Sequence, residues 1–73
     1  MLKETEIRRI VAANVARARG RRGLTMTAAA AAAGVTQSFW SQIESADRCP
    51  KIPVLARMAE SLGVRPATLL KGL

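Results

Sequence analysis

The sequence predicts an all-α domain of five helices with no β-strand, and three observations support this fold class. Apolar residues recur at three- and four-residue steps along most of the chain, which is the spacing of one helix face. Glycine or proline interrupts the pattern at intervals that suit helices of ordinary length. Apolar and polar residues nowhere alternate over a long run, as they do in a half-buried strand. At this length we expect a single domain over residues 1–73.

The first helix is expected from about residue 3 to residue 19. Its apolar face consists of Ile7, Val11, Val15 and Ala18. Thr5 or a neighbouring residue is the candidate cap at its start. Gly20 and Gly23 enclose a short basic turn, Arg21-Arg22, which we expect to end the helix.

The second and third helices are predicted to form a helix-turn-helix unit over about residues 25–45. Thr25 is the expected N-cap of a helix over residues 26–33, whose alanines have high helix propensity, and Gly34 ends it. Thr36 is the next N-cap candidate, and its helix runs to about Ser45. A connection of so few residues sets two helices at about 90–120°.

The third helix has two chemically different sides. Phe39, Trp40 and Ile43 form a side that we expect to be buried. The other side carries neutral hydrogen-bonding groups, those of Gln37, Ser38, Ser41 and Gln42.

The last two helices follow a loop over residues 47–52. Pro53 suits the first turn of a helix over about residues 53–62, which Gly63 ends. Its apolar face consists of Val54, Leu55, Met58, Ala59 and Leu62. A short final helix begins near Pro66 and carries Leu69 and Leu70.

The charge of the chain indicates a polyanionic partner. Twelve Lys and Arg residues face five Asp and Glu residues, so the net charge is +7. A small basic domain is typical of nucleic-acid binding. The alternative is a basic surface that serves solubility.

Residues for catalysis, metal or membrane insertion are scarce. Histidine and tyrosine are absent and Cys49 is the only cysteine, so we expect no enzyme, no metal site, no cofactor and no disulfide. The glycines do not form a phosphate-binding loop. The apolar run over residues 28–35 is far shorter than the ~20 residues of a membrane span, and charges near the N-terminus do not suit a signal peptide. We therefore expect a cytoplasmic protein.

The stretch from Val11 to Leu70 resembles the Cro/CI-type (XRE-like) helix-turn-helix family of phage and bacterial repressors. The resemblance rests on several short runs in one ungapped register, together with Ala30 and Pro50; the runs are Ala13–Arg19, Arg22–Thr25, Gly34–Ser38, Ser41–Glu44 and Met58–Val64. It implies a five-helix fold like that of lambda repressor.

The resemblance also implies which residues contact DNA. In this family the second helix of the motif lies in the major groove, and its N-terminal side chains reach base edges. By position, Gln37 and Ser38 face the bases first, Gln42 follows one turn on, and Thr36 and Ser41 flank them. The alternative is that these are ordinary solvated helix residues.

Phosphate contacts are expected beside the reading helix. The free backbone amides near Thr25 and Met26 suit a phosphate, and basic residues expected in loops add charge, namely Arg21, Arg22, Arg48 and Lys51. The resemblance further implies an ion pair between Arg19 and Glu44 that orients the reading helix. The alternative is that Arg19 binds phosphate.

Three positions depart from the family pattern. Met26 replaces a Gln that usually braces phosphate. Trp40 replaces an Ile or Val, and we expect it to fill the space left by Ala29 and Ala33. Ala46 stands where Gly commonly closes the third helix, so that this end is expected to be frayed or shifted.

The predicted function is that of a transcriptional regulator, a repressor, acting as a homodimer on a palindromic site in double-stranded DNA. The candidate dimer contacts are Leu62, Val64, Leu69, Leu70 and Leu73, whose alternative role is core packing. The alternative function is an antitoxin-type component that binds a protein partner and represses its own operon.

Overall fold

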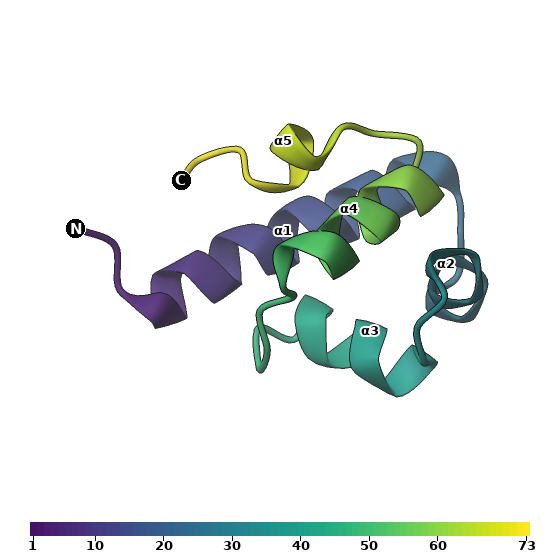
Figure 1. Ribbon diagram of the computed structural model, residues 1–73, viewed down its shortest axis with the longest axis horizontal. Coiled ribbons are helices and arrows are strands. Elements are labelled where there is room, and N and C mark those ends of the chain that lie inside the picture. Colours follow the sequence, from purple (N-terminus) through teal and green to yellow (C-terminus); the bar gives the residue numbers. More distant parts are fainter.

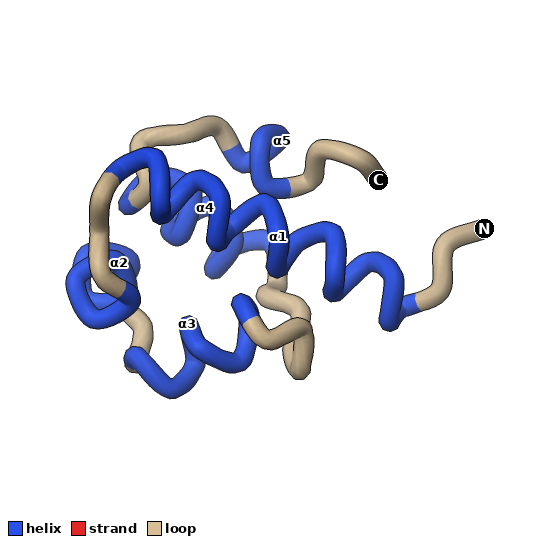
Figure 2. Tube along the Cα trace, turned by 180° about the vertical axis from the view of Figure 1, so that it is seen from behind, coloured by secondary structure: helices blue, strands red, loops and turns tan.

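A computed structural model describes all residues, 1–73, and confirms the all-α fold with five helices. The helices are α1 (Glu4–Arg22), α2 (Met26–Ala33), α3 (Gln37–Glu44), α4 (Ile52–Ser61) and α5 (Pro66–Leu69). Helix α1 is the longest and runs across the molecule, with α3 and α5 on opposite sides of it and α4 crossing in front of it (Figure 1). From behind, α4 lies on the far side of α1 (Figure 2).

The core lies where α1, α2, α3 and α4 meet, and Trp40 is the largest side chain that is fully buried in it. Ala29 and Ala33 on α2 are buried in the same cluster, and α2 packs against both α3 and α4. The small side chains of α2 leave room for the large indole on α3, so that the core keeps a native packing density.

The predicted end of the first helix is wrong, because Gly20 lies inside α1 and Gly23 closes it. A glycine in a helix interior costs only about 1 kcal/mol relative to alanine, too little to end a helix whose apolar face is packed. Gly23 adopts the left-handed conformation, with φ of 71°. Arg21 and Arg22 therefore belong to the last turn of α1 and not to a loop.

The starts of α2 and α3 agree with the expected caps. The hydroxyl oxygen of Thr25 accepts a hydrogen bond from the Ala28 N–H at 3.1 Å, and that of Thr36 accepts one from the Phe39 N–H at 3.0 Å. Helix α1, in contrast, is capped by Lys3 and not by Thr5, and the Lys3 N–H donates to the Glu6 carboxylate at 3.4 Å.

Helix α3 closes in an ordered way although Ala46 occupies the position that favours glycine. Ala46 has φ of 65°, its N–H donates to the Ile43 carbonyl at 3.1 Å, and the Asp47 N–H donates to the Gln42 carbonyl at 3.0 Å. These two bonds are those of a Schellman closure. The Arg8 Nε–H also donates to the Ala46 carbonyl at 3.0 Å, so the expected fraying is wrong.

The C-terminal segment is tied back to α1. The buried Asn14 side-chain amide donates to the carbonyls of Leu69 and Lys71, both at 2.9 Å. Leu62 and Leu69 are only 2% and 0% exposed and belong to the core. Their prediction as dimer contacts is therefore wrong, because they are used within the monomer; Val64 and Leu70 are half-buried and Leu73 is exposed.

Candidate nucleic-acid interface

Helix α3 presents one polar side to solvent. Successive residues turn by about 100° in a helix, so the buried Trp40 and Ile43 define one side and leave the opposite side free. Gln37, Ser38 and Ser41 are exposed there, and Gln42 is half-buried beside them. Each of these groups both donates and accepts hydrogen bonds, and none is charged.

Thr36 differs from the other predicted base-contacting residues because its oxygen has a structural role. The oxygen accepts the hydrogen bond that caps α3, while the O–H can still donate outward. Thr36 is exposed at the start of the helix, a position that suits phosphate better than a base edge.

A partly buried ion pair fixes α3 against α1. The guanidinium of Arg19 makes two bonds to Glu44, from Nε to Oε2 at 2.6 Å and from Nη2 to Oε1 at 2.9 Å. The third donor, Nη1, binds the Leu24 carbonyl at 2.9 Å, just before α2. One arginine thereby joins α1, the segment leading into α2, and the end of α3, and the alternative role of Arg19 in binding phosphate has no support in this geometry.

Trp40 adds a third hydrogen bond to the same carboxylate. Its buried Nε1–H donates to Glu44 Oε2 at 2.6 Å. Trp40 was expected to fill the space left by Ala29 and Ala33, and this hydrogen bond was not predicted. The four-residue separation of Trp40 and Glu44 was the available signal, since residues at that spacing lie on the same side of a helix.

These contacts shift the protonation of both charged partners. Burial raises the pKa of Glu44, but the hydrogen bonds from Arg19 and Trp40 outweigh it and hold that pKa below its ordinary value. The hydrogen bond with Glu44 raises the pKa of Arg19. Both groups therefore stay charged across the physiological range.

The predicted phosphate contact near Thr25 and Met26 falls at the N-terminus of α2. Thr25 is exposed and caps the helix, and the amides of the first helical turn have no partner within the helix. The side chain of Met26 is half-buried against the core, so this residue offers its backbone to a ligand and its side chain to packing.

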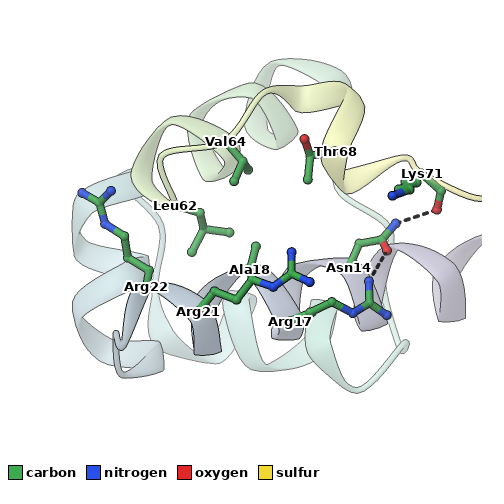
Figure 3. Close-up of a pocket in the computed structure, with 9 residues that line it drawn as sticks. All are labelled: Asn14, Arg17, Ala18, Arg21, Arg22, Leu62, Val64, Thr68 and Lys71. Atoms are coloured by element: carbon green, nitrogen blue, oxygen red, sulfur yellow. Dashed lines mark hydrogen bonds between the residues drawn. The ribbon is translucent and has the colours of Figure 1, made fainter.

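The basic residues fall into two groups. Arg48 and Lys51 are exposed in the loop between α3 and α4, and the Arg48 guanidinium lies 5.3 Å from the centre of the Phe39 ring on α3. Arg21 and Arg22 line a hollow together with residues of α5 and of the segments before and after it, and no residue of α2 or α3 lines it (Figure 3). Arg22 stands three residues before Thr25 in the chain, and the role of Arg21 and Arg22 in binding phosphate stays a prediction.

Comparison with known proteins assigns this arrangement to a family. A family described as a helix-turn-helix domain matches residues 10–71. The chain belongs to this helix-turn-helix family. An uncharacterized HTH-type transcriptional regulator, y4dJ of Sinorhizobium fredii, is 34% identical over 65 residues, which cover 89% of this chain and 84% of that protein.

Solved structures of regulators are similar to the whole helix-turn-helix domain. An HTH_3 family transcriptional regulator from Vibrio cholerae superposes with a TM-score of 0.87 at 25% identity, over 92% of this chain and 38% of the other. The clp gene regulator ClgR from C. glutamicum gives 0.82 at 25% identity, over 88% and 83%. The hypothetical transcription factor NHTF from Neisseria gives 0.85 at 24% identity, over 96% and 80%, and supports the fold.

The family defines the role of the α2–α3 unit. The chain is a helix-turn-helix transcriptional regulator of the XRE-like type, and α2 with α3 forms its DNA-binding motif. No helix is both long enough and apolar enough to span a membrane.

Proposed function

We propose that this protein is a sequence-specific repressor that binds double-stranded DNA with α3 in the major groove. The observation that carries the proposal is the uncharged side of α3, formed by the exposed Gln37, Ser38 and Ser41 with the half-buried Gln42. A Gln amide pairs in bidentate fashion with N6 and N7 of adenine, and a Ser hydroxyl serves several bases. Hydrogen bonds of this kind discriminate between bases, whereas charge alone does not.

Affinity in this proposal comes from groups around α3. The exposed Arg48 and Lys51 bind phosphates on one flank. The backbone amides at Thr25 and Met26 bind a phosphate at the start of α2. Arg21 and Arg22 are left out of this set, because they line the hollow near α5.

We further propose that the protein acts as a homodimer on a palindromic operator. Val64, Leu70 and Leu73 are the predicted dimer contacts that are not part of the buried core. A two-fold symmetric dimer of this fold reads half-sites about one helical turn, ~34 Å, apart. Because its ligand is genomic DNA and its relatives are regulators, we expect it to act in the cytoplasm and to have no catalytic role.

The test is selection of bound sequences from a random DNA pool by the purified protein, at about 0.15 M salt, where non-specific attraction is screened. Recovery of an inverted repeat supports a dimeric, sequence-specific regulator, and the spacing of its halves gives the dimer geometry. A single enriched half-site overturns the dimer and keeps base readout. No enrichment overturns the proposal and favours the antitoxin alternative, with a protein as the primary partner.

A further inference from the structure

A hollow of about 620 Å³ lies between α1 and the segment that joins α4 to α5 (Figure 3). Arg17 and Arg21 stand on the α1 wall, and Val64, Thr68 and Lys71 stand on the opposite wall. This volume is within the range of small-molecule sites in proteins, about 300–1,000 Å³. The hollow is distinct from the exposed side of α3, because no residue of α2 or α3 lines it.

The hollow gathers positive charge without any compensating negative charge. Four of its nine lining residues are basic, namely Arg17, Arg21, Arg22 and Lys71; Arg22 stands at one end, with its guanidinium turned toward Gly63 and away from the other three (Figure 3). None of the five Asp and Glu residues of the chain lines it, and neither of the two ion pairs, Arg8–Glu4 and Arg19–Glu44, involves these four cations. Like charges held together in one concave site raise the local concentration of anions.

Hydrogen bonds fix the two backbone walls of the hollow, although its four basic side chains are exposed. Asn14 binds the carbonyls of Leu69 and Lys71, and its own Oδ1 accepts a hydrogen bond from Arg17 Nη1 at 3.0 Å. Arg22 lies directly against Gly63, since a Cβ on Gly63 would be 2.5 Å from Arg22 Nη1. The two walls are thus held at a set separation.

The remaining lining residues are chiefly apolar. Val64 is half-buried and supplies the accessible apolar surface, whereas Ala18 and Leu62 are buried beneath it. Such a site combines a few charged groups, which fix the orientation of a ligand, with apolar surface, which binds its carbon skeleton. This combination favours an organic anion over an inorganic one.

We infer that this hollow, termed the α1–α5 pocket, binds a small organic molecule that carries a phosphate or carboxylate group on an apolar ring or chain. Guanidinium groups bind both of these anions through paired hydrogen bonds.

The test uses phenyl phosphate as the probe, in a titration of the full chain followed by amide NMR shifts. We expect saturating shifts at Ala18, Val64 and Thr68, with a dissociation constant of about 1 mM for a ligand of this size. Inorganic phosphate tests the charge alone and benzyl alcohol tests the ring alone. Each is expected to bind at least about ten-fold more weakly, because it engages only one of the two kinds of lining group.

Two arginine variants test whether phenyl phosphate binds in the α1–α5 pocket. Arg21→Ala is expected to weaken phenyl phosphate binding about five-fold or more, as the loss of one charge-assisted contact requires. Arg57→Ala removes an equal charge from an exposed residue that does not line the pocket and is expected to leave binding unchanged. Equal effects of the two variants, or shifts confined to α3 and Arg48, would overturn the assignment.

Two further outcomes are decisive. A hexaglutamate peptide that binds the same amides more tightly than phenyl phosphate would overturn a small-molecule site and indicate an acidic protein segment. DNA selection with Arg21→Ala separates this inference from the proposed function, because the pocket is expected to be independent of base readout. Loss of sequence selection in that variant would show that the pocket is part of the DNA surface, contrary to the inference.

Discussion

The two sides of α1 present different kinds of polar surface. On the side of α3, the exposed helix residues are uncharged and carry amide and hydroxyl groups. On the side of α5, four of the 12 basic residues of the chain surround one hollow. Net charge therefore does not map the proposed DNA-reading surface, because α3, the helix proposed to recognise bases, has no basic residue.

The two sides also differ in how firmly their polar groups are held. The Arg19–Glu44 pair is partly buried, with side-chain exposures of 23% and 12%, and it fixes α3. The pocket cations are exposed at their tips. We term the Arg19–Glu44 pair, with the bond from Trp40, the α3 anchor. Substitutions in the anchor are therefore expected to lower the free energy of unfolding, whereas substitutions of the pocket cations are expected to change ligand binding alone.

The largest expected effect comes from removing the anchor of α3. Glu44→Ala leaves the Arg19 guanidinium and the buried Trp40 Nε1–H without their shared acceptor, and we expect a loss of about 2–4 kcal/mol in the free energy of unfolding. Urea denaturation measures it. Glu60→Ala, at an exposed glutamate on α4, is the matched control and should change stability by less than about 0.5 kcal/mol. Equal losses of stability in the two variants would mean that Glu44 contributes no more than an ordinary surface glutamate.

The same anchor predicts a loss of stability in acid. The pKa of Glu44 is lowered in the folded protein, so its contribution is complete above the unfolded value of about 4.3 and is lost as the pH falls through the folded value. Between pH 5 and 3, we expect wild type to lose more stability than Glu44→Gln, which has no carboxylate to protonate. Parallel curves for the two proteins would contradict this assignment.

Next in size is the effect of Gln37 on base preference. Gln37→Ala removes an exposed amide from the first turn of α3, and we expect binding to the preferred site to weaken by about 1–3 kcal/mol, with relaxed selection at one base pair of each half-site. Competition binding with single-base variants of the operator measures both. An unchanged base preference would show that α3 is not the reading helix in the proposed orientation.

Arg48 tests the source of affinity beside α3. Arg48→Ala is expected to weaken binding on all sequences alike and to reduce the salt-dependence slope by about 1, because one phosphate contact is lost. Arg21→Ala removes the same charge from the pocket and is expected to leave the slope unchanged. If Arg21→Ala reduces the slope as much as Arg48→Ala does, the distinction between the two sides of α1 fails.

Local sequence signals were sufficient for the helices that begin and end with strong caps. Helix α2 lies between Thr25 and Gly34, and both signals are unambiguous. The end of α1 was missed because two glycines three residues apart compete, and the choice depends on packing along the whole helix. That error of three residues also put Arg21 and Arg22 in a loop beside α2 instead of in the last turn of α1.

The candidate site was predictable in its residues and in one of its two supports. The pattern of polar and apolar residues predicted the polar side of α3, and the resemblance implied the Arg19–Glu44 pair, whereas the bond from Trp40 to Glu44 depends on how far the indole reaches within the core. Periodicity did not separate core from surface among the C-terminal leucines, because α5 has only four residues. The pocket was not predictable either, since it requires residues about 50 positions apart, such as Arg21 and Lys71, to meet.

The smallest expected effects are those of two substitutions of opposite chemistry, one at the end of α3 and one inside α1. Ala46→Gly relieves a left-handed alanine at the end of α3, and Gly20→Ala adds a methyl group where nothing lies within 4 Å, inside α1. We expect each to raise the free energy of unfolding by about 0.5–1 kcal/mol. The two gains should be additive, because the positions share no partner, and thermal unfolding of the single and double variants measures this. A loss of stability in Ala46→Gly would mean that contacts of the Ala46 methyl group outweigh its backbone strain, and a loss in Gly20→Ala would mean that α1 ends before Gly20 in solution.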